Sequence, residues 1–99
     1  MTRGLVLQPE AEEDIRSARR WYEQQAPGLG LGFLRAVEAG IARIERTPDL
    51  YAAVDENTRR ARLRRFPFAI YYEVEADQLV VFAIWHHRRD PRGWQQRAR

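Results

Sequence analysis

The sequence predicts a single α+β domain. An N-terminal strand precedes an antiparallel helical hairpin, which packs on a three- to four-stranded, mainly antiparallel sheet. Apolar residues recur at helical spacing through the first half of the chain, and they alternate with the two-residue period of a strand through the second half. A length of 99 residues supports one modest core, so we expect one domain over residues 1–99.

The composition excludes several classes of protein. The chain has no cysteine, which excludes disulfides, thiol catalysis and cysteine-ligated zinc, and we expect neither a metal site nor a cofactor. No apolar run approaches the ~20 residues of a membrane span, and the N-terminus is too polar for a signal peptide, so we expect a cytoplasmic protein with no membrane partner. All 17 basic residues are arginine, so no lysine can act as a nucleophile or titrating base.

The first strand and the first helix are expected at the start of the chain. Residues 3–8 form the strand candidate. Pro9 suits the first turn of a helix, because its missing N–H would be unpaired there in any case. The acidic residues that follow lie at the positive end of the helix dipole. The apolar face of this helix has residues spaced four, three and four apart: Ala11, Ile15, Ala18 and Tyr22.

A second helix is expected over residues 30–46. The Ala-Pro-Gly sequence at 26–28 breaks the first helix, and Thr47 ends the second, because a residue before proline avoids the helical region. So short a break predicts an antiparallel hairpin. The glycines of the break do not indicate a nucleotide site, since no strand precedes them and no lysine, serine or threonine follows. The expected buried face comprises Phe33, Leu34, Val37, Ile41 and Ile44.

Four strand candidates follow the helices. Residues 51–54 form a weak candidate, and residues 59–64 show a clear period of two. Residues 68–75 have one core face, made of Phe68, Ile70, Tyr72 and Val74. Residues 79–85 are apolar on both faces, as in a central strand that is covered on both sides.

A basic strand is the first candidate for a working surface. Five arginines lie within residues 59–65, and Arg60, Arg62 and Arg64 share one face of the expected strand. Three like charges at alternate strand positions repel unless an anionic group lies across them. Residues 51–99 carry ten arginines and six acidic residues, so the sheet half of the chain is the half that favours an anionic partner.

A second basic cluster follows the last expected strand, in a loop that runs to Trp94. The cluster comprises His86, His87, Arg88, Arg89 and Arg92. Neighbouring residues at a strand end face opposite ways, so one histidine is expected to point inward and the other toward solvent. Residues 95–99 are expected to form a flexible tail.

Three segments of the chain together resemble the RelE/ParE toxin superfamily, and most of all its ParE-like branch of plasmid-stabilisation toxins. They are the helix QPEAEEDIRSARRWYE, the strand segment RARLRRFPFAIYYEV and the ending VFAIWHHRRDPRGW. The patterns F-P-F-x-I-x-Y and H-x-R-R-D-P-x-x-W are specific when they occur together, and the resemblance spans residues 5–94.

This resemblance implies the toxin of a type II toxin–antitoxin pair. Its partner would be a ParD-like antitoxin of the ribbon-helix-helix class with an acidic C-terminal segment, in a heteromeric complex. ParE-like members are known for inhibiting DNA gyrase, whereas RelE-like members cleave mRNA on the ribosome. We expect a ParE-like gyrase inhibitor. The alternatives are a ribosome-dependent endoribonuclease and an inactive member that only binds its antitoxin.

The candidate site residues divide by function. The arginines expected to bind the antitoxin are Arg60, Arg62 and Arg64. The expected target contacts are Arg88, Arg89, Arg92 and Trp94. A metal-free ribonuclease needs a base, an acid and cations around the phosphate. Its candidates here are Arg62, Arg64, His86, His87 and Arg88. The chain departs from the RelE-like set, because lysines are absent and Trp94 stands where a tyrosine would be expected, and this favours a binding site over a nuclease site.

Overall fold

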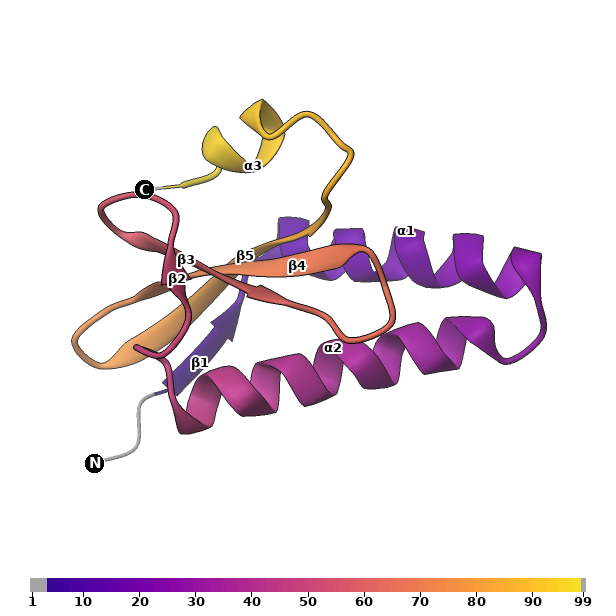
Figure 1. Ribbon diagram of the computed structural model, residues 1–99, viewed down its shortest axis with the longest axis horizontal. Coiled ribbons are helices and arrows are strands. Elements are labelled where there is room, and N and C mark those ends of the chain that lie inside the picture. Colours follow the sequence, from indigo (N-terminus) through magenta and orange to yellow (C-terminus); the bar gives the residue numbers. More distant parts are fainter. Residues whose placement is uncertain (1–3, 99) are drawn as a thin grey trace.

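The computed structural model describes residues 4–98 and confirms the α+β class. Figure 1 shows the long helices α1 and α2 as an antiparallel pair, with the short α3 apart from them. None of the described helices is long and apolar enough to cross a membrane. The elements in chain order are β1 (Gly4–Leu7), α1 (Pro9–Gln25), α2 (Leu29–Arg46), β2 (Ala52–Ala53), β3 (Thr58–Arg62), β4 (Phe68–Val74), β5 (Gln78–His86) and α3 (Arg92–Gln95).

The sheet has five strands in the order β1-β5-β4-β3-β2, one more than the upper number expected. The pairs among β2, β3, β4 and β5 are antiparallel, and β1 adds to β5 in parallel. The extra strand arises because both short candidates, β1 and β2, join the ladder. A bulge interrupts the β4–β5 register, since Tyr72 pairs with Val81 while Tyr71 pairs with Ala83 and leaves Phe82 as the extra residue.

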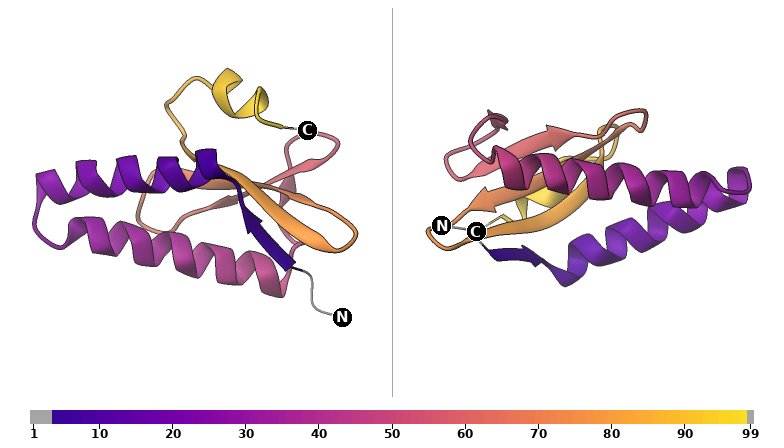
Figure 2. Two further views of the ribbon diagram at one scale, coloured as in Figure 1. Left: turned by 180° about the vertical axis from the view of Figure 1, so that it is seen from behind. Right: turned by 90° about the horizontal axis from the view of Figure 1, so that it is seen from below.

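The helical hairpin is held at its tip by one carboxylate. Glu23, near the end of α1, accepts hydrogen bonds from the backbone N–H groups of Gly28 and Gly30, so it satisfies the free amides at the start of α2. Gly28 has a left-handed backbone (φ 88°), which glycine adopts without strain. Both views in Figure 2 show the tip of the hairpin extending beyond the sheet.

The main core lies between the hairpin and one face of the sheet. The apolar faces expected for both helices and for β4 lie in this core, in agreement with the sequence pattern, except that Leu34 is not among its members. Phe33 of α2 meets Phe66 and Phe68 in edge-to-face contacts at 5.4 and 5.0 Å. The other buried members of the main core include Ala11, Ala18, Val37, Ile44, Ile70, Tyr72, Val81 and Ile84.

A second, smaller core lies on the opposite face of the sheet. The sequence predicts only one core face for β4, but the C-terminal segment packs on its other face as well. The buried members of this core are Ala69, Tyr71, Phe82, Ala83, Trp85 and Trp94. The prediction of a flexible tail is wrong for residues 95–98, because Arg97 forms an ion pair with Asp14 and Ala98 packs on this core. Arg99 lies outside the described residues.

Candidate functional site

A basic hollow of about 140 Å³ lies over β3, β4 and the turn that joins them. Arg60 pairs with Tyr71 and Arg62 pairs with Ala69 across β3 and β4, so both arginines lie on the face that carries the second core. His87 lines the hollow with them. Its apolar lining includes Phe66 and Pro67, which are partly exposed, and Leu63, which is buried in the main core.

The structure brings together two of the three arginines expected to bind the antitoxin. Arg64 is exposed and lies in the turn after β3, because the strand ends at Arg62, two residues earlier than expected. Arg65 in the same turn has φ 69°, a left-handed backbone that a strand cannot continue through. Arg64 is not among the residues that line the basic hollow.

The neighbouring Arg59 has a structural role. Its guanidinium donates to the backbone carbonyls of Asp49 and Tyr51, at 3.1 and 2.7 Å, and so holds the connection between α2 and β2. By contrast, no ion pair within residues 4–98 involves Arg60 or Arg62. Two cations therefore lie beside an apolar wall without a counter-charge, which is an arrangement suited to an anionic side chain on a partner.

The basic loop, residues 86–92, is built around Trp85. The indole N–H donates to the Asp90 carbonyl at 3.2 Å, and the Arg89 guanidinium lies 3.7 Å from the centre of the ring. At the other end of the loop, Gly93 lies directly against the ring, since a Cβ there would be 2.3 Å from it. Trp85 is only 3% exposed, so these contacts fix the course of the loop.

The arginines of the basic loop differ in how far they are neutralised. Arg92 forms an exposed ion pair with Asp90 at 2.6 Å. The Arg92 side chain and its backbone N–H both donate to Asp90, and they lower the pKa of that carboxyl below its ordinary value. Within the described chain, neither Arg88 nor Arg89 forms an ion pair, and both are exposed. Arg88 and Arg89 are therefore the exposed cations of this loop that the described chain leaves without an ion pair.

Trp94 is oriented inward rather than toward a target. The residue is 6% exposed, and its ring stacks on Tyr71 with 4.3 Å between centroids and 19° between planes. This stacking holds α3, and with it the end of the basic loop, against the sheet. Direct stacking of Trp94 on a target would require α3 to leave the sheet.

The two histidines differ in burial, as expected, but their rings lie 5.2 Å apart and do not face opposite ways, because β5 ends at His86. His86 is partly buried, meets Phe68 edge-on at 5.0 Å and accepts the Arg88 backbone N–H at Nδ1. Burial, with the nearby charges of His87 and Arg88, lowers the pKa of His86. His87 is exposed and lines the basic hollow. Among the residues expected for a ribonuclease, Arg62 and His87 line the basic hollow together, and the His86 ring lies beside His87 without lining the hollow.

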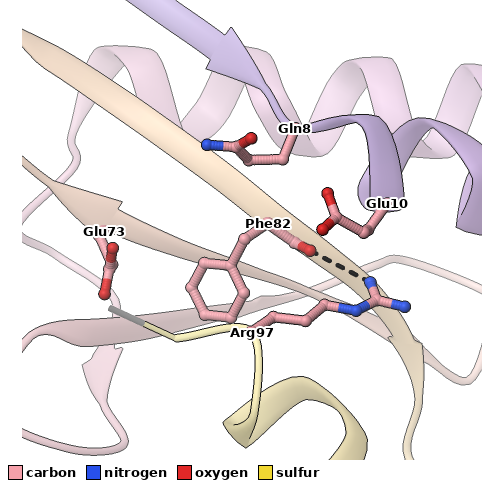
Figure 3. Close-up of a pocket in the computed structure, with 5 residues that line it drawn as sticks. All are labelled: Gln8, Glu10, Glu73, Phe82 and Arg97. Carbon is pink, nitrogen blue, oxygen red and sulfur yellow. Dashed lines mark hydrogen bonds between the residues drawn. The ribbon is translucent and has the colours of Figure 1, made fainter.

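Asp14 and Arg97 are structural residues that the sequence did not point to. Arg97 donates to Asp14 at 2.6 and 3.2 Å and to the Phe82 carbonyl at 3.1 Å, as Figure 3 shows for the last contact. Arg97 and Phe82 also line a separate hollow of about 110 Å³. Its other lining residues are Gln8, Glu10 and Glu73. The two partners lie at opposite ends of the chain, so no local spacing could have indicated the pair.

Within residues 4–98, no group of three or more histidine or acidic side chains is placed to hold a metal ion. The candidate surfaces of the described chain are therefore the basic hollow and the basic loop. Both are cationic surfaces bordered by aromatic rings, suited to binding anionic partners.

Comparisons with known proteins place this geometry in a family. A solved structure described as the chromosomal ParDE TA system from P. aeruginosa superposes with a TM-score of 0.76, covering 86% of this chain and 96% of that chain. The sequence identity is 16%, so this likeness shows the fold. No curated protein gives a significant match. The profile of the family described as "ParE toxin of type II toxin-antitoxin system, parDE" matches residues 5–91, and the chain therefore belongs to the ParE toxin family.

Proposed function

We propose that this ParE toxin inhibits DNA gyrase through its basic loop. The observation that carries the proposal is the pair of exposed, unneutralised cations, Arg88 and Arg89, on a loop whose path is fixed by Trp85. A loop that is already ordered loses less conformational entropy when it binds, so more of the contact energy appears as affinity. A stoichiometric inhibitor needs such a preorganised surface and needs no catalytic base.

We propose that a ParD-like antitoxin docks an acidic segment across the basic hollow. Arg60 and Arg62 supply two charges, and Phe66 and Pro67 supply an adjacent apolar wall. An acidic residue next to an apolar one in the partner would match both features. The antitoxin and gyrase would then meet separate surfaces of the toxin, in a heteromeric complex that forms in the cytoplasm.

A supercoiling assay with purified gyrase tests the proposed target. The wild-type toxin is expected to inhibit supercoiling and to stabilise cleaved DNA. The double variant R88A/R89A is expected to require at least a tenfold higher concentration, because each hydrogen bond from a charged group contributes about 1.5–3 kcal/mol and about 1.4 kcal/mol is tenfold. The matched control is R16A/R20A, which removes two exposed charges from α1.

Two results would contradict the proposal, one for the target and one for the contact surface. The first is a wild-type toxin that binds its antitoxin but leaves supercoiling unchanged. The second is an R88A/R89A variant that inhibits gyrase as strongly as the R16A/R20A control. The second result would retain gyrase as the target and exclude the basic loop as the contact.

A ribosome-dependent endoribonuclease is the second candidate, because His87 and Arg62 line the same hollow. An exposed imidazole beside an arginine has the chemistry of a general base next to a phosphate-binding cation. Expression without antitoxin separates the candidates. Cut transcripts and immediate translation arrest, both abolished by H87Q, would favour the nuclease. DNA-damage signalling that persists in H87Q would favour gyrase, and normal growth would indicate a member that only binds its antitoxin.

A further inference from the structure

One edge of β5 is paired with β1 only over the first half of the strand. β1 pairs with β5 from Gly4 to Leu7, and the Gln8 backbone N–H then donates to the Val81 carbonyl. Beyond that point no other strand of residues 4–98 lies on this side of β5. The bulge at Phe82 shifts by one residue the set of backbone groups that point toward this unpaired edge. The N–H and C=O groups that point there after the bulge need partners other than a strand.

Asp14 and Arg97 supply those partners. The Ile84 backbone N–H donates to the Asp14 carboxylate at 3.0 Å, and the Phe82 carbonyl accepts from the Arg97 guanidinium at 3.1 Å. The two side chains are also joined to each other, at 2.6 and 3.2 Å. Together they occupy the place that a continuing neighbour strand would take, with one donor and one acceptor.

The pair is shielded from solvent, unlike the other ion pairs described. The Asp14 side chain is 8% exposed and the Arg97 side chain 20% exposed, whereas side chains in the remaining pairs are about half exposed or more. Shielded, fork-shaped contacts between arginine and carboxylate restrict geometry far more than surface pairs do. Removing either partner leaves a backbone group and a charge without their bonds.

The pair is connected to the basic loop through Trp85. The Arg97 guanidinium lies 4.9 Å from the centre of the Trp85 ring, and the Arg89 guanidinium of the loop lies 3.7 Å from the same ring centre. Arg97 lies three residues after Trp94, so its bonds also hold in place the C-terminal segment that stacks on the sheet. Asp14, Arg97, Trp85 and Arg89 therefore form a continuous chain of contacts from α1 to the exposed loop.

We propose that Asp14 and Arg97 are positioning residues for the basic loop. Their ion pair closes the C-terminal segment on β5, holds the Trp85 ring in place and thereby sets where Arg88 and Arg89 lie. In its effect on toxicity the inference rests on the proposed gyrase contact, whereas its effect on Trp85 does not. The basic hollow lies on β3 and β4 and makes no contact with the pair, so antitoxin binding is independent of it.

Hydrogen exchange of the Trp85 indole N–H tests the inference directly. This proton is bonded to the loop carbonyl of Asp90, so it is protected only while the loop is closed. In D14N and in R97Q its exchange is expected to accelerate about tenfold or more, since opening becomes easier by the loss of a shielded pair. R97K keeps the charge without the planar fork and is expected to fall between R97Q and wild type.

Two controls separate positioning from general loss of stability. E13Q changes the neighbouring carboxylate, which makes only exposed contacts. Y72F removes a partly buried hydrogen bond from a main-core residue, away from the loop. Both are expected to leave the indole exchange within about twofold of wild type under native conditions.

The same variants are then assayed with gyrase and with antitoxin. D14N and R97Q are expected to lose inhibition about tenfold while antitoxin affinity stays unchanged. Indole exchange as slow in D14N and R97Q as in E13Q would overturn the inference. Accelerated exchange together with a wild-type toxin that does not inhibit gyrase would uphold the positioning role and reject the proposed target instead.

Discussion

Replacing Gly93 by alanine adds a single methyl group at the contact between α3 and Trp85. The added Cβ would lie 2.3 and 2.4 Å from two carbons of the Trp85 ring. Carbon atoms in contact are about 3.5–4.0 Å apart, so the ring or the helix must move by more than about 1 Å. Gly93 does not have a positive φ, so the backbone itself accepts alanine.

The expected sign follows from two opposing magnitudes. Alanine in a helix is more favourable than glycine by at most about 1 kcal/mol. Overpacking a filled core costs about 1–3 kcal/mol, and Trp85, at 3% exposed and hydrogen-bonded through its indole, has little space to yield. We therefore expect G93A to lower the free energy of unfolding by about 1–2 kcal/mol.

The matched control is Gly32 in α2, where the nearest atom to an added Cβ is a ring carbon of Phe66 at 3.9 Å. G32A is expected to raise the free energy of unfolding by up to about 1 kcal/mol. Urea denaturation of both variants measures the difference directly. If G93A proved as stable as G32A, α3 would not lie against Trp85, and the argument that Trp85 fixes the basic loop would be refuted.

Three further expectations concern Tyr72 and Glu23, whose side chains bond to backbone groups. Y72F removes the hydrogen bond from the Tyr72 hydroxyl to the Pro48 carbonyl (2.6 Å) and is expected to cost about 1–2 kcal/mol in urea unfolding. Burial raises the pKa of Tyr72 to about 12. The stability that comes from keeping this phenol neutral is therefore present below pH ~10 and is lost as the pH rises from there to about 12. Alkaline titration of Y72F should lack this loss. Hydrogen bonds from the Gly28 and Gly30 amides lower the pKa of Glu23. The stability that this carboxylate contributes is therefore present above its ordinary pKa and is lost as the pH falls through the lowered value. On acidification, the melting temperature of E23Q should fall less than that of the wild type.

Much of the fold could be predicted from the sequence because it rests on local periodicity. The spacing of Ala11 and Ala18, and of Val37 and Ile44, identifies the helix faces that enter the main core. The unbroken apolar run in β5 indicates a central strand covered on both sides, and the structure confirms this. These signals depend on neighbours within a few residues, so one sequence is enough to find them.

The features that the sequence did not predict depend on distant contacts. Nothing near Asp14 indicates that its carboxylate bonds to β5 and to Arg97, which lies at the other end of the chain. Trp94 was expected at the target surface, but its partner Tyr71 comes from β4, so its burial could not be derived from its own neighbours. Arg64 leaves the basic face because β3 ends early, and strand ends are the least certain part of a periodic pattern.

The most direct test of the central claim measures two activities on three variants. The claim is that the basic hollow binds the antitoxin and the basic loop binds gyrase. We expect R60E/R62E to weaken antitoxin binding about 100-fold or more while gyrase inhibition persists, and R88A/R89A to do the reverse. R64E, a charge reversal just outside the hollow, should change antitoxin affinity by less than about tenfold. Loss of both activities together in either double variant would contradict the claim of two separate surfaces.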